Sequence, residues 1–237
     1  MSQPVFLITG GGGGIGSATA CLAAEAGFAL VLAGRRKETL EDVRRGLPTT
    51  TQILTVACDV AEWSQMRDLV AAAESTFGRL DVAFANAGVS PDTSFLGTNG
   101  AEPEEWREAV LTNVLGPALT ARAALPALVR AGGHLVLTGS VAGRGVRIGS
   151  LYSATKWAVT ALSQSIRAEC AGSGVRVTLI QPGLVNTEPS MAKEERRHDP
   201  KLEPSDIARA VLFAVGEPRH VDVSEIVIRP AGAGPYR

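Results

Sequence analysis

The chain has 237 residues, of which 45% are hydrophobic and 20% are charged, a balance typical of globular proteins rather than of disordered or fibrous ones. Its 23 Lys and Arg residues are offset by 24 Asp and Glu residues, and the net charge of −1 provides no broad attraction to nucleic acid or to an anionic membrane. We therefore expect one compact domain with neither a nucleic-acid partner nor a membrane partner.

Short apolar runs alternate with amphipathic segments along the whole chain. This alternation is typical of repeated βαβ units around a parallel sheet that is buried on both faces. The apolar runs predict strands over residues 5–9, 29–33, 53–57, 82–85, 135–138, 175–180 and 226–228. The main amphipathic segments predict helices over residues 15–26, 63–77, 106–129 and 151–171. Residues 1–237 are thus predicted to form one α/β domain with a doubly wound, seven-stranded parallel sheet and helices on both faces.

Few segments fit neither pattern. No stretch approaches the roughly 20 apolar residues that span a bilayer, and no basic region precedes the first apolar run, so we expect a cytoplasmic protein. Residues 99–105 and 188–203 are the long irregular candidates. The second is charged and flanked by proline, which favours a surface loop or a lid over a substrate.

A run of glycines, Gly10 to Gly14 and Gly16, lies between the first predicted strand and the first predicted helix. Glycine permits a tight turn and a close approach of a pyrophosphate to the backbone, and the helix N-terminus supplies free N–H groups and a positive dipole end. Two registers fit: Gly11, Gly13 and Gly16 satisfy GxGxxG, whereas Gly10, Gly14 and Gly16 satisfy TGxxxGxG. Either register predicts a nucleotide site at this turn.

The second predicted strand leads into Gly34, followed by Arg35 and Arg36. A site for NAD commonly has an acidic residue at this place, which binds the ribose hydroxyls. A guanidinium instead grips a 2′-phosphate with paired hydrogen bonds. The two arginines therefore favour NADP(H) over NAD(H). The alternative is that they only open a solvated helix.

Tyr152 and Lys156 lie four residues apart in the stretch YSATK, at the start of the last predicted helix. Side chains at this spacing stack on one helix face, roughly 5–6 Å apart at Cβ. A tyrosine with its ordinary pKa of about 10 is a poor proton donor at neutral pH, and a neighbouring ammonium favours the phenolate. Such a pair alone is typical of a helix surface, so its meaning depends on the rest of the chain.

Seven short motifs, in order and correctly spaced, resemble those of the short-chain dehydrogenase/reductase family over nearly the whole chain. They are TGGGGGIG (9–16), CDV (58–60), NAG (86–88), NVLG (113–116), TGS (138–140), YSATK (152–156) and PGLVNT (182–187). The resemblance implies a Rossmann-type fold and an NADP(H)-dependent oxidoreductase that interconverts a carbonyl compound, aldehyde or ketone, and an alcohol. It also implies a homodimer or homotetramer, and the two long Ala-rich predicted helices suit such an interface.

The resemblance also implies roles for single residues. Ser140, Tyr152 and Lys156 would form the catalytic group, with Asn113 in support. Asp59 would contact the adenine, and Asn86 would hold the backbone beside the cofactor. The implied cofactor-binding set is Gly10, Gly14, Ile15, Gly16, Arg35, Arg36, Asp59, Val60, Asn86, Ala87, Gly88, Tyr152, Lys156, Pro182, Gly183, Val185 and Thr187. Val185 and Thr187 would meet the nicotinamide carboxamide. Some NADP-dependent members carry a basic residue where this chain has Gly13, so the phosphate contact rests on the two arginines.

The implied mechanism gives the tyrosine–lysine pair a purpose. Hydride transfer to a carbonyl carbon builds negative charge on its oxygen, and Tyr152 would supply the proton. Lowering its pKa by roughly 3 units requires about 4 kcal/mol of preferential phenolate stabilisation, much of which Lys156 can supply. The resemblance implies that Lys156 also bonds the nicotinamide ribose and that Asn113 holds a water that relays protons to it. Ser140 would donate a hydrogen bond to the substrate oxygen.

Two other functions are weighed against this one. The first is a non-catalytic dinucleotide-sensing or scaffold protein, which would have no need of the intact Ser140, Tyr152 and Lys156 group. The second is methyl transfer on the same fold, which leaves NAG and YSATK unexplained. The substrate stays open: Ile148 and Leu184, with Val146, indicate an apolar wall, and Arg144 or Arg147 is a candidate for binding an acid group.

The remaining chemistry-bearing side chains are interpreted as structural. Cys21, Cys58 and Cys170 show neither CxxC spacing nor a Cys/His cluster, so we expect reduced, structural thiols and no metal. The histidines match no triad or metal spacing, and the tryptophans are expected to serve packing; these residues are His134, His198, His220, Trp63, Trp106 and Trp157.

Overall fold

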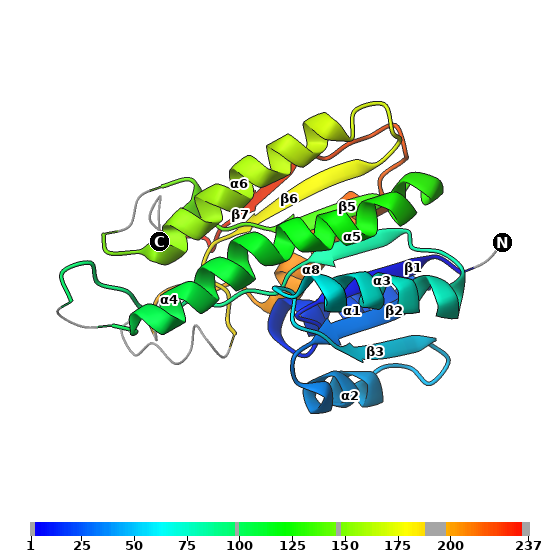
Figure 1. Cartoon of the computed structure of the whole chain (residues 1–237), viewed down its shortest axis with the longest axis horizontal. Coiled ribbons are helices and arrows are strands. Elements are labelled where there is room, and N and C mark those ends of the chain that lie inside the picture. The colour runs from blue at the N-terminus through cyan, green and yellow to red at the C-terminus, as the bar shows by residue number, and fades with distance from the viewer. Residues whose placement is uncertain (1–2, 98–99, 146–147, 188–197, 234–237) are drawn as a thin grey trace.

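The computed structural model describes residues 3–97, 100–145, 148–187 and 198–233. They form a sheet of seven parallel strands in the order β3-β2-β1-β4-β5-β6-β7, as Figure 1 shows. The strands are β1 (Val5–Thr9), β2 (Ala29–Gly34), β3 (Ile53–Ala57), β4 (Val82–Ala85), β5 (His134–Thr138), β6 (Arg176–Pro182) and β7 (Glu225–Ile228). Each predicted strand is confirmed to within two residues: β1, β2, β4, β5 and β6 are apolar runs that are mostly buried in the sheet, whereas the edge strands β3 and β7 are only partly buried.

The strand order places the site. The chain begins at β1 in the middle of the sheet, moves outward to β2 and β3, and then returns to β4 on the other side of β1. The loops that leave β1 and β4 therefore diverge at the carboxyl ends of neighbouring strands. Doubly wound sheets bind their ligands in the crevice at such a switch point.

Helices cover both faces of the sheet, as predicted. Helices α3, α5 and α6 pack on one face, and α1, α2 and α8 pack on the other (Figure 1). Their bounds are α1 (Gly14–Glu25), α2 (Lys37–Gly46), α3 (Trp63–Phe77), α4 (Pro103–Val110), α5 (Gly116–Ala131), α6 (Leu151–Glu169) and α8 (Pro204–Gly216), with the π-helical turn η1 (Leu111–Leu115) and the 3-10 turn η2 (Val141–Gly143).

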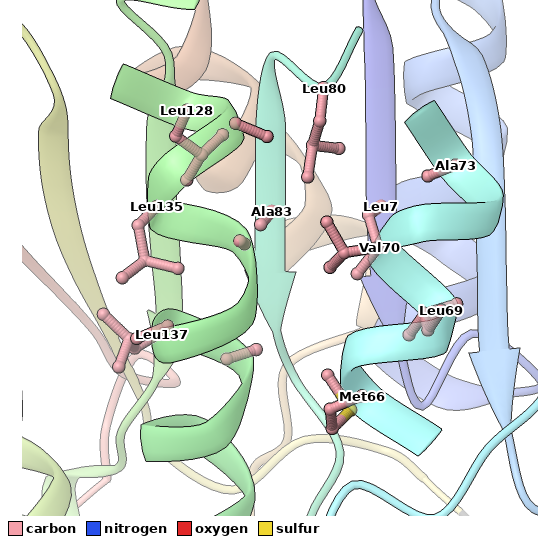
Figure 2. Packing of buried hydrophobic residues seen from close by; sticks show 14 of the residues in the cluster. Leu7, Met66, Leu69, Val70, Ala73, Leu80, Ala83, Leu128, Leu135 and Leu137 are labelled. Atoms are coloured by element: carbon pink, nitrogen blue, oxygen red, sulfur yellow. The ribbon is translucent and has the colours of Figure 1, made fainter. Parts of the chain in front are cut away.

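Two apolar clusters hold the layers together, one on each side of the sheet. Because side chains alternate along a strand, Val5 and Leu7 of β1 enter one cluster while Phe6 and Ile8 enter the other. Figure 2 shows the first cluster, in which α3 and α5 pack over β1, β4 and β5. Full burial of such a side chain contributes about 1.5–3 kcal/mol, so the core fixes the ends of the strands from which the site loops leave.

The stretch predicted as one helix over residues 106–129 is helical throughout, but it is not α-helical along its whole length. The structure divides this stretch into α4, η1 and α5, and α4 begins at Pro103, so part of the predicted irregular stretch 99–105 is helical. A capping box of Glu102 and Glu105 starts α4. Pro117 has no N–H and cannot make the usual helical bond to the Asn113 carbonyl, which favours the wider π-helical turn.

The end of the predicted loop 188–203 is anchored. Residues 188–197 lie outside the described residues. Beyond them, Leu202 forms a parallel bridge with Val185, and a capping box of Glu203 and Asp206 opens α8. The part of residues 188–203 that the structure describes is thus tied to the segment that follows β6.

Candidate active site

The four predicted catalytic residues come from three places along the chain. Ser140 follows β5, Asn113 lies in η1, and Tyr152 and Lys156 lie in the first two turns of α6. Lys156 is bound to the last residue of β5, and Asn113 is bound to the loop after β4. The sheet and these contacts bring the four residues to the carboxyl edge, beside the switch point.

Lys156 is a buried cation whose side chain reaches the end of β5. Its Nζ donates a 2.8 Å hydrogen bond to the Thr138 carbonyl and lies 5.6 Å from the ring centroid of Tyr152. Burial lowers the pKa of Lys156 to about 8, because desolvation disfavours the charged amine. Within the described part of the chain the Thr138 carbonyl is the only hydrogen-bond acceptor of this amine, so two of its three donors remain for a ligand or water.

Tyr152 is half-buried at the second position of α6. The helix start beneath it is fixed by Ser150, whose side chain accepts a 3.1 Å hydrogen bond from the Ser153 N–H. Thr155 donates a 2.7 Å bond from its hydroxyl to the Tyr152 carbonyl. The backbone that carries the phenol is therefore held on both sides.

Asn113 is fully buried, and its amide is bound to protein groups. Its Oδ1 accepts from the Val89 N–H at 2.9 Å, and its Nδ2 donates to the Val89 carbonyl at 2.8 Å and to Thr155 Oγ1 at 3.2 Å. A contact chain therefore runs from the loop after β4 through Asn113 and Thr155 to the Tyr152 carbonyl. This side chain positions the loop and the helix, and the water expected at Asn113 stays a prediction.

Ser140 is buried at the start of η2. Its Oγ accepts a 3.1 Å hydrogen bond from the Ala142 N–H and donates a long bond of 3.4 Å to the Pro182 carbonyl. The proton of this hydroxyl is held weakly at 3.4 Å, so it can turn toward a substrate oxygen at small cost.

Thr93 ties the loop after β4 to the loop before α6. Its hydroxyl donates to the Gly149 carbonyl at 2.5 Å and accepts from the Leu151 N–H at 3.0 Å. Leu151 is the first residue of α6, so its N–H is one of those that the helix leaves unpaired. This clasp lies next to Tyr152 in the chain, and the sequence carries no motif that would have predicted it.

The glycine run makes a cradle before α1. Gly14 has a φ of +51°, which favours glycine, and a Cβ on Gly16 would lie 2.1 Å from the Gly10 carbonyl oxygen, which excludes any side chain. These constraints fit the TGxxxGxG register. Within the described residues no side chain caps the N-terminus of α1, so its N–H groups remain for an anion such as a pyrophosphate.

Asn86 and Thr9 join the glycine cradle to the end of β4. Asn86 Nδ2 donates to the Thr9 carbonyl at 3.1 Å, and Thr9 Oγ1 accepts from the backbone N–H groups of Asn86 and Ala87 at 3.0 and 3.2 Å. Thr138 donates to Asn86 Oδ1 at 3.3 Å. The expected backbone-holding role of Asn86 fits these bonds, whereas Thr9 and Thr138 were absent from the predicted site because their contacts exist only in the folded sheet.

The remaining predicted cofactor residues line the same edge. Asp59 Oδ1 accepts from the Ala61 N–H at 2.9 Å, which forms the turn that carries the buried Val60. A Cβ on Gly14 would lie 3.1 Å from Thr187 Cγ2, so the segment after β6 lies against the glycine cradle. Of the other members, Ile15 follows β1, Gly88 follows β4, Pro182 is the last residue of β6, and Gly183 and Val185 follow that strand.

The two arginines after β2 differ in their surroundings. Arg35 forms an ion pair with Glu108 of α4, with Nη1 and Oε1 2.5 Å apart. Arg36 is exposed, and among the described residues its side chain has no ion-pair partner. The ion pair of Arg35 was not expected from the sequence, because its partner is 73 residues away.

Several other side chains named from the sequence lie outside this edge. Arg144, a candidate for an acid group, is paired with Glu225; Ile148 is exposed, and Val146 and Arg147 lie outside the described residues. The expectation that all three cysteines are structural is wrong in one respect: Cys21 is exposed on α1, whereas Cys58 and Cys170 are buried. Among the tryptophans, Trp106 packs edge-on against Phe95, whereas Trp63 and Trp157 are 43% and 47% exposed.

His134 is buried at the start of β5, where Nε2 lies 2.7 Å from Thr178 Oγ1. Burial and the nearby Arg176 lower its pKa to about 3, so this ring stays neutral. Across residues 3–97, 100–145, 148–187 and 198–233 no three His, Cys, Asp or Glu side chains gather as a metal site would need. Over the same ranges no helix has both the length and the apolar character of a membrane span.

Comparison with known proteins assigns the family. The model of the short chain dehydrogenase family matches residues 4–198. An uncharacterized oxidoreductase of Staphylococcus aureus strain USA300 is 38% identical over 232 residues, which cover 97% of this chain and 98% of the relative. The chain therefore belongs to the short-chain dehydrogenase family and is an oxidoreductase, and this family uses nicotinamide dinucleotides.

Solved structures agree over nearly the whole length of the chain. The alcohol dehydrogenase of the archaeon Thermococcus sibiricus, complexed with 5-hydroxy-NADP, superposes with a TM-score of 0.89 at 30% identity and covers 98% of this chain and 99% of its own. A metagenomic short-chain oxidoreductase in complex with NADP gives a TM-score of 0.83 at 30% identity, covering 97% and 98%.

Proposed function

We propose that the chain is an NADP(H)-dependent oxidoreductase that interconverts an aldehyde or ketone and an alcohol, with Tyr152 as the general acid and base. The observation that carries the proposal is the buried amine of Lys156, held at the Thr138 carbonyl and 5.6 Å from the Tyr152 ring. A buried cation beside a phenol favours the phenolate and therefore makes the phenol a better proton donor at neutral pH.

The residues present fit a nicotinamide dinucleotide. The glycine cradle cannot hold a side chain at Gly16, and the uncapped start of α1 suits a pyrophosphate. The two spare donors of Lys156 suit ribose hydroxyls. The bound nicotinamide would supply or accept the hydride.

The chain's own groups would handle the proton and the developing charge. In the direction of reduction, the Tyr152 hydroxyl gives its proton to the carbonyl oxygen of the substrate. The Ser140 hydroxyl donates a hydrogen bond to the same oxygen as negative charge builds there. Asn113 and Thr155 keep the loop after β4 and the first turn of α6 in register, and so act as positioning residues.

The preference for NADP(H) rests on Arg35 and Arg36 at the end of β2. A guanidinium binds a 2′-phosphate with paired, charge-assisted hydrogen bonds, and within the described residues the end of β2 offers no carboxylate at the usual place for a ribose contact. Two relatives of known structure were solved with NADP or a derivative of it. These points support NADP(H) as the physiological cofactor of this chain.

A homo-oligomer, dimer or tetramer, is part of the same proposal. Apolar side chains stay exposed along the continuous rod of α4, η1 and α5 and on the neighbouring α6, which suits a contact with a second copy; they are Val110, Leu115, Val129 and Trp157. Light scattering coupled to size exclusion measures this directly, and a monomer mass would reject it.

The test of the proposed function is a panel of aldehydes, ketones and secondary alcohols, followed at the absorbance of reduced nicotinamide with each cofactor in turn. We expect turnover of at least one carbonyl compound with NADPH, and a higher kcat/KM with NADPH than with NADH. Binding of a dinucleotide without turnover of any member of a broad panel would favour a sensing or scaffold role. A higher kcat/KM with NADH would overturn the cofactor assignment alone.

A further inference from the structure

Arg35 does not stand free at the end of β2. Its guanidinium is paired with Glu108, which lies near the end of α4 and reaches across to the first half of the sheet. Both side chains are open to solvent, with 58% of the arginine side chain and 45% of the glutamate side chain exposed. The pair therefore lies at the surface of the region to which the proposed function assigns the adenine end of the cofactor.

The two proposed ligands of Arg35 compete. A phosphate on the 2′-oxygen of the adenine ribose carries up to two negative charges, and binding it at Arg35 brings those charges next to the Glu108 carboxylate. The phosphate and the carboxylate would repel each other when both lie beside the same guanidinium. Arg35 would also have to give up hydrogen bonds to the Glu108 carboxylate in order to bind the phosphate. NAD(H) has a hydroxyl at this position and meets no comparable conflict.

We propose that Glu108 is a specificity-determining residue, which weakens NADP(H) relative to NAD(H) by holding Arg35. The inference rests on the proposed dinucleotide-binding function and concerns its balance between the two cofactors. The second guanidinium, Arg36, has no ion-pair partner among the described residues and remains available to the phosphate. Glu108 thus reduces the preference for NADP(H) without abolishing it.

The test measures binding rather than turnover, by calorimetric titration of the full chain with NADP+ and with NAD+. Removing the charge in Glu108→Gln is expected to tighten NADP+ about three- to fivefold, the size of an exposed ion-pair contribution, and to leave the Kd for NAD+ unchanged. Because the pair is exposed, the gain should shrink as salt is raised from about 0.05 to 0.5 M.

Glu104→Gln is the matched control. It removes the same charge from the same exposed helix, one turn earlier, at a residue for which the structure shows no ion pair within the described part of the chain. Its Kd for NADP+ should stay within about twofold of the wild-type value. An equal gain in both variants would mean a general field effect and would overturn the assignment to Glu108.

A variant of Arg35 separates this inference from the proposed function. In an Arg35→Gln background, Glu108→Gln should no longer tighten NADP+, because the group for which the two anions compete is gone. If Arg35→Gln raises the Kd for NADP+ while Glu108→Gln leaves that Kd unchanged, the proposed role of Glu108 is wrong and the proposed function stands. If the wild-type chain binds neither dinucleotide, the proposed function fails and this inference fails with it.

Discussion

The proposed site depends on two cations, Lys156 and Arg35, which differ in how far they are buried. Lys156 is buried, its amine is bound to the Thr138 carbonyl, and burial lowers its pKa to about 8. Arg35 is more than half exposed and is paired with a carboxylate of another helix. The first cation lies at the reacting end of the proposed cofactor site, and the second lies at the adenine end.

This difference in burial means that Lys156 should govern the rate of the reaction, whereas Arg35 should govern the choice of cofactor. In a buried, water-poor environment a single charge acts strongly on its neighbour, so changes around Lys156 should alter rate and stability by large factors. At the surface, solvent and salt weaken each charge, so changes around Arg35 should alter cofactor choice by small factors. Four experiments test this gradient.

The largest effect should come from Tyr152→Phe at the buried end. The variant lacks the proton donor but keeps the ring over Lys156, so we expect kcat to fall about 10³-fold with the Kd for NADP+ nearly unchanged. Steady-state kinetics on a substrate found in the panel, together with calorimetric titration, measures both. A kcat near the wild-type value would end the general-acid role.

Lys156→Met should stabilise the free protein. The folded pKa lies near 8 and the ordinary value is 10.5, so below pH 8 burial of the charged amine costs the folded state about 3 kcal/mol. The methionine variant avoids this cost and loses one hydrogen bond worth about 1 kcal/mol, so it should be about 2 kcal/mol more stable at pH 7.

The stability difference between Lys156→Met and the wild-type protein should depend on pH. Between pH 8 and 10.5 the unfolded chain holds a proton on Lys156 that the folded chain has released, so the cost disappears as pH rises through this window. Urea unfolding of both proteins at pH 7 and pH 10 should therefore show the advantage of the variant at pH 7 only. A constant difference at both pH values would contradict the burial of a charged amine.

Thr155→Val should affect catalysis without touching a reacting group. It removes the hydroxyl that links Asn113 to the Tyr152 carbonyl, and we expect kcat to fall about three- to tenfold while KM for the cofactor changes little. Thr155→Ser keeps the hydroxyl and should restore most of the rate. If serine behaves like valine, the loss comes from packing and not from the hydrogen bonds.

The smallest effect should come from Gly13→Lys at the exposed end. Gly13 has a φ of 176° and ψ of 176°, an extended conformation that any residue adopts, and a Cβ there meets no atom within 4 Å. The added cation beside the glycine cradle can attract the pyrophosphate of both cofactors and, in addition, the 2′-phosphate of NADP+, so it should tighten NADP+ about two- to fivefold more than NAD+. Gly13→Gln, which has similar bulk and no charge, should show no gain, and tighter binding there would exclude an electrostatic cause.

Most of the fold could be predicted from the sequence, because buried segments must consist of apolar residues. A strand buried on both faces must be a continuous apolar run, so Val5–Thr9 and Val82–Ala85 could be placed to the residue. The turn at Leu111–Leu115 could not, because apolar spacing does not distinguish a π-helical turn from an α-helical one. The start of α4 was missed because its capping box uses two glutamates rather than a serine or threonine at the N-cap.

The site was predictable where a residue type carries its own chemistry. Tyr152, Lys156 and the glycines could be singled out because their spacing has a chemical meaning without the fold. Thr9, Thr138 and Thr155 are common polar residues, and their roles depend on partners that only the folded chain brings close. Thr9, for instance, donates a hydrogen bond to the carbonyl of Phe84, which is 75 residues away in the sequence. The pairing of Arg35 with Glu108 belongs to the same class.

The hydroxyl of Thr93 has a practical consequence for anyone who redesigns this protein. We expect the loop after Gly88 to form part of the substrate pocket, and this hydroxyl joins that loop to Gly149 and to the first residue of the helix that bears the phenol. Substrate selectivity and turnover rate are therefore coupled through these hydrogen bonds. Variants with changed residues around position 93 should differ from the wild type in turnover rate as well as in substrate range. Keeping threonine at this position while randomising its neighbours is the way to vary one property without the other.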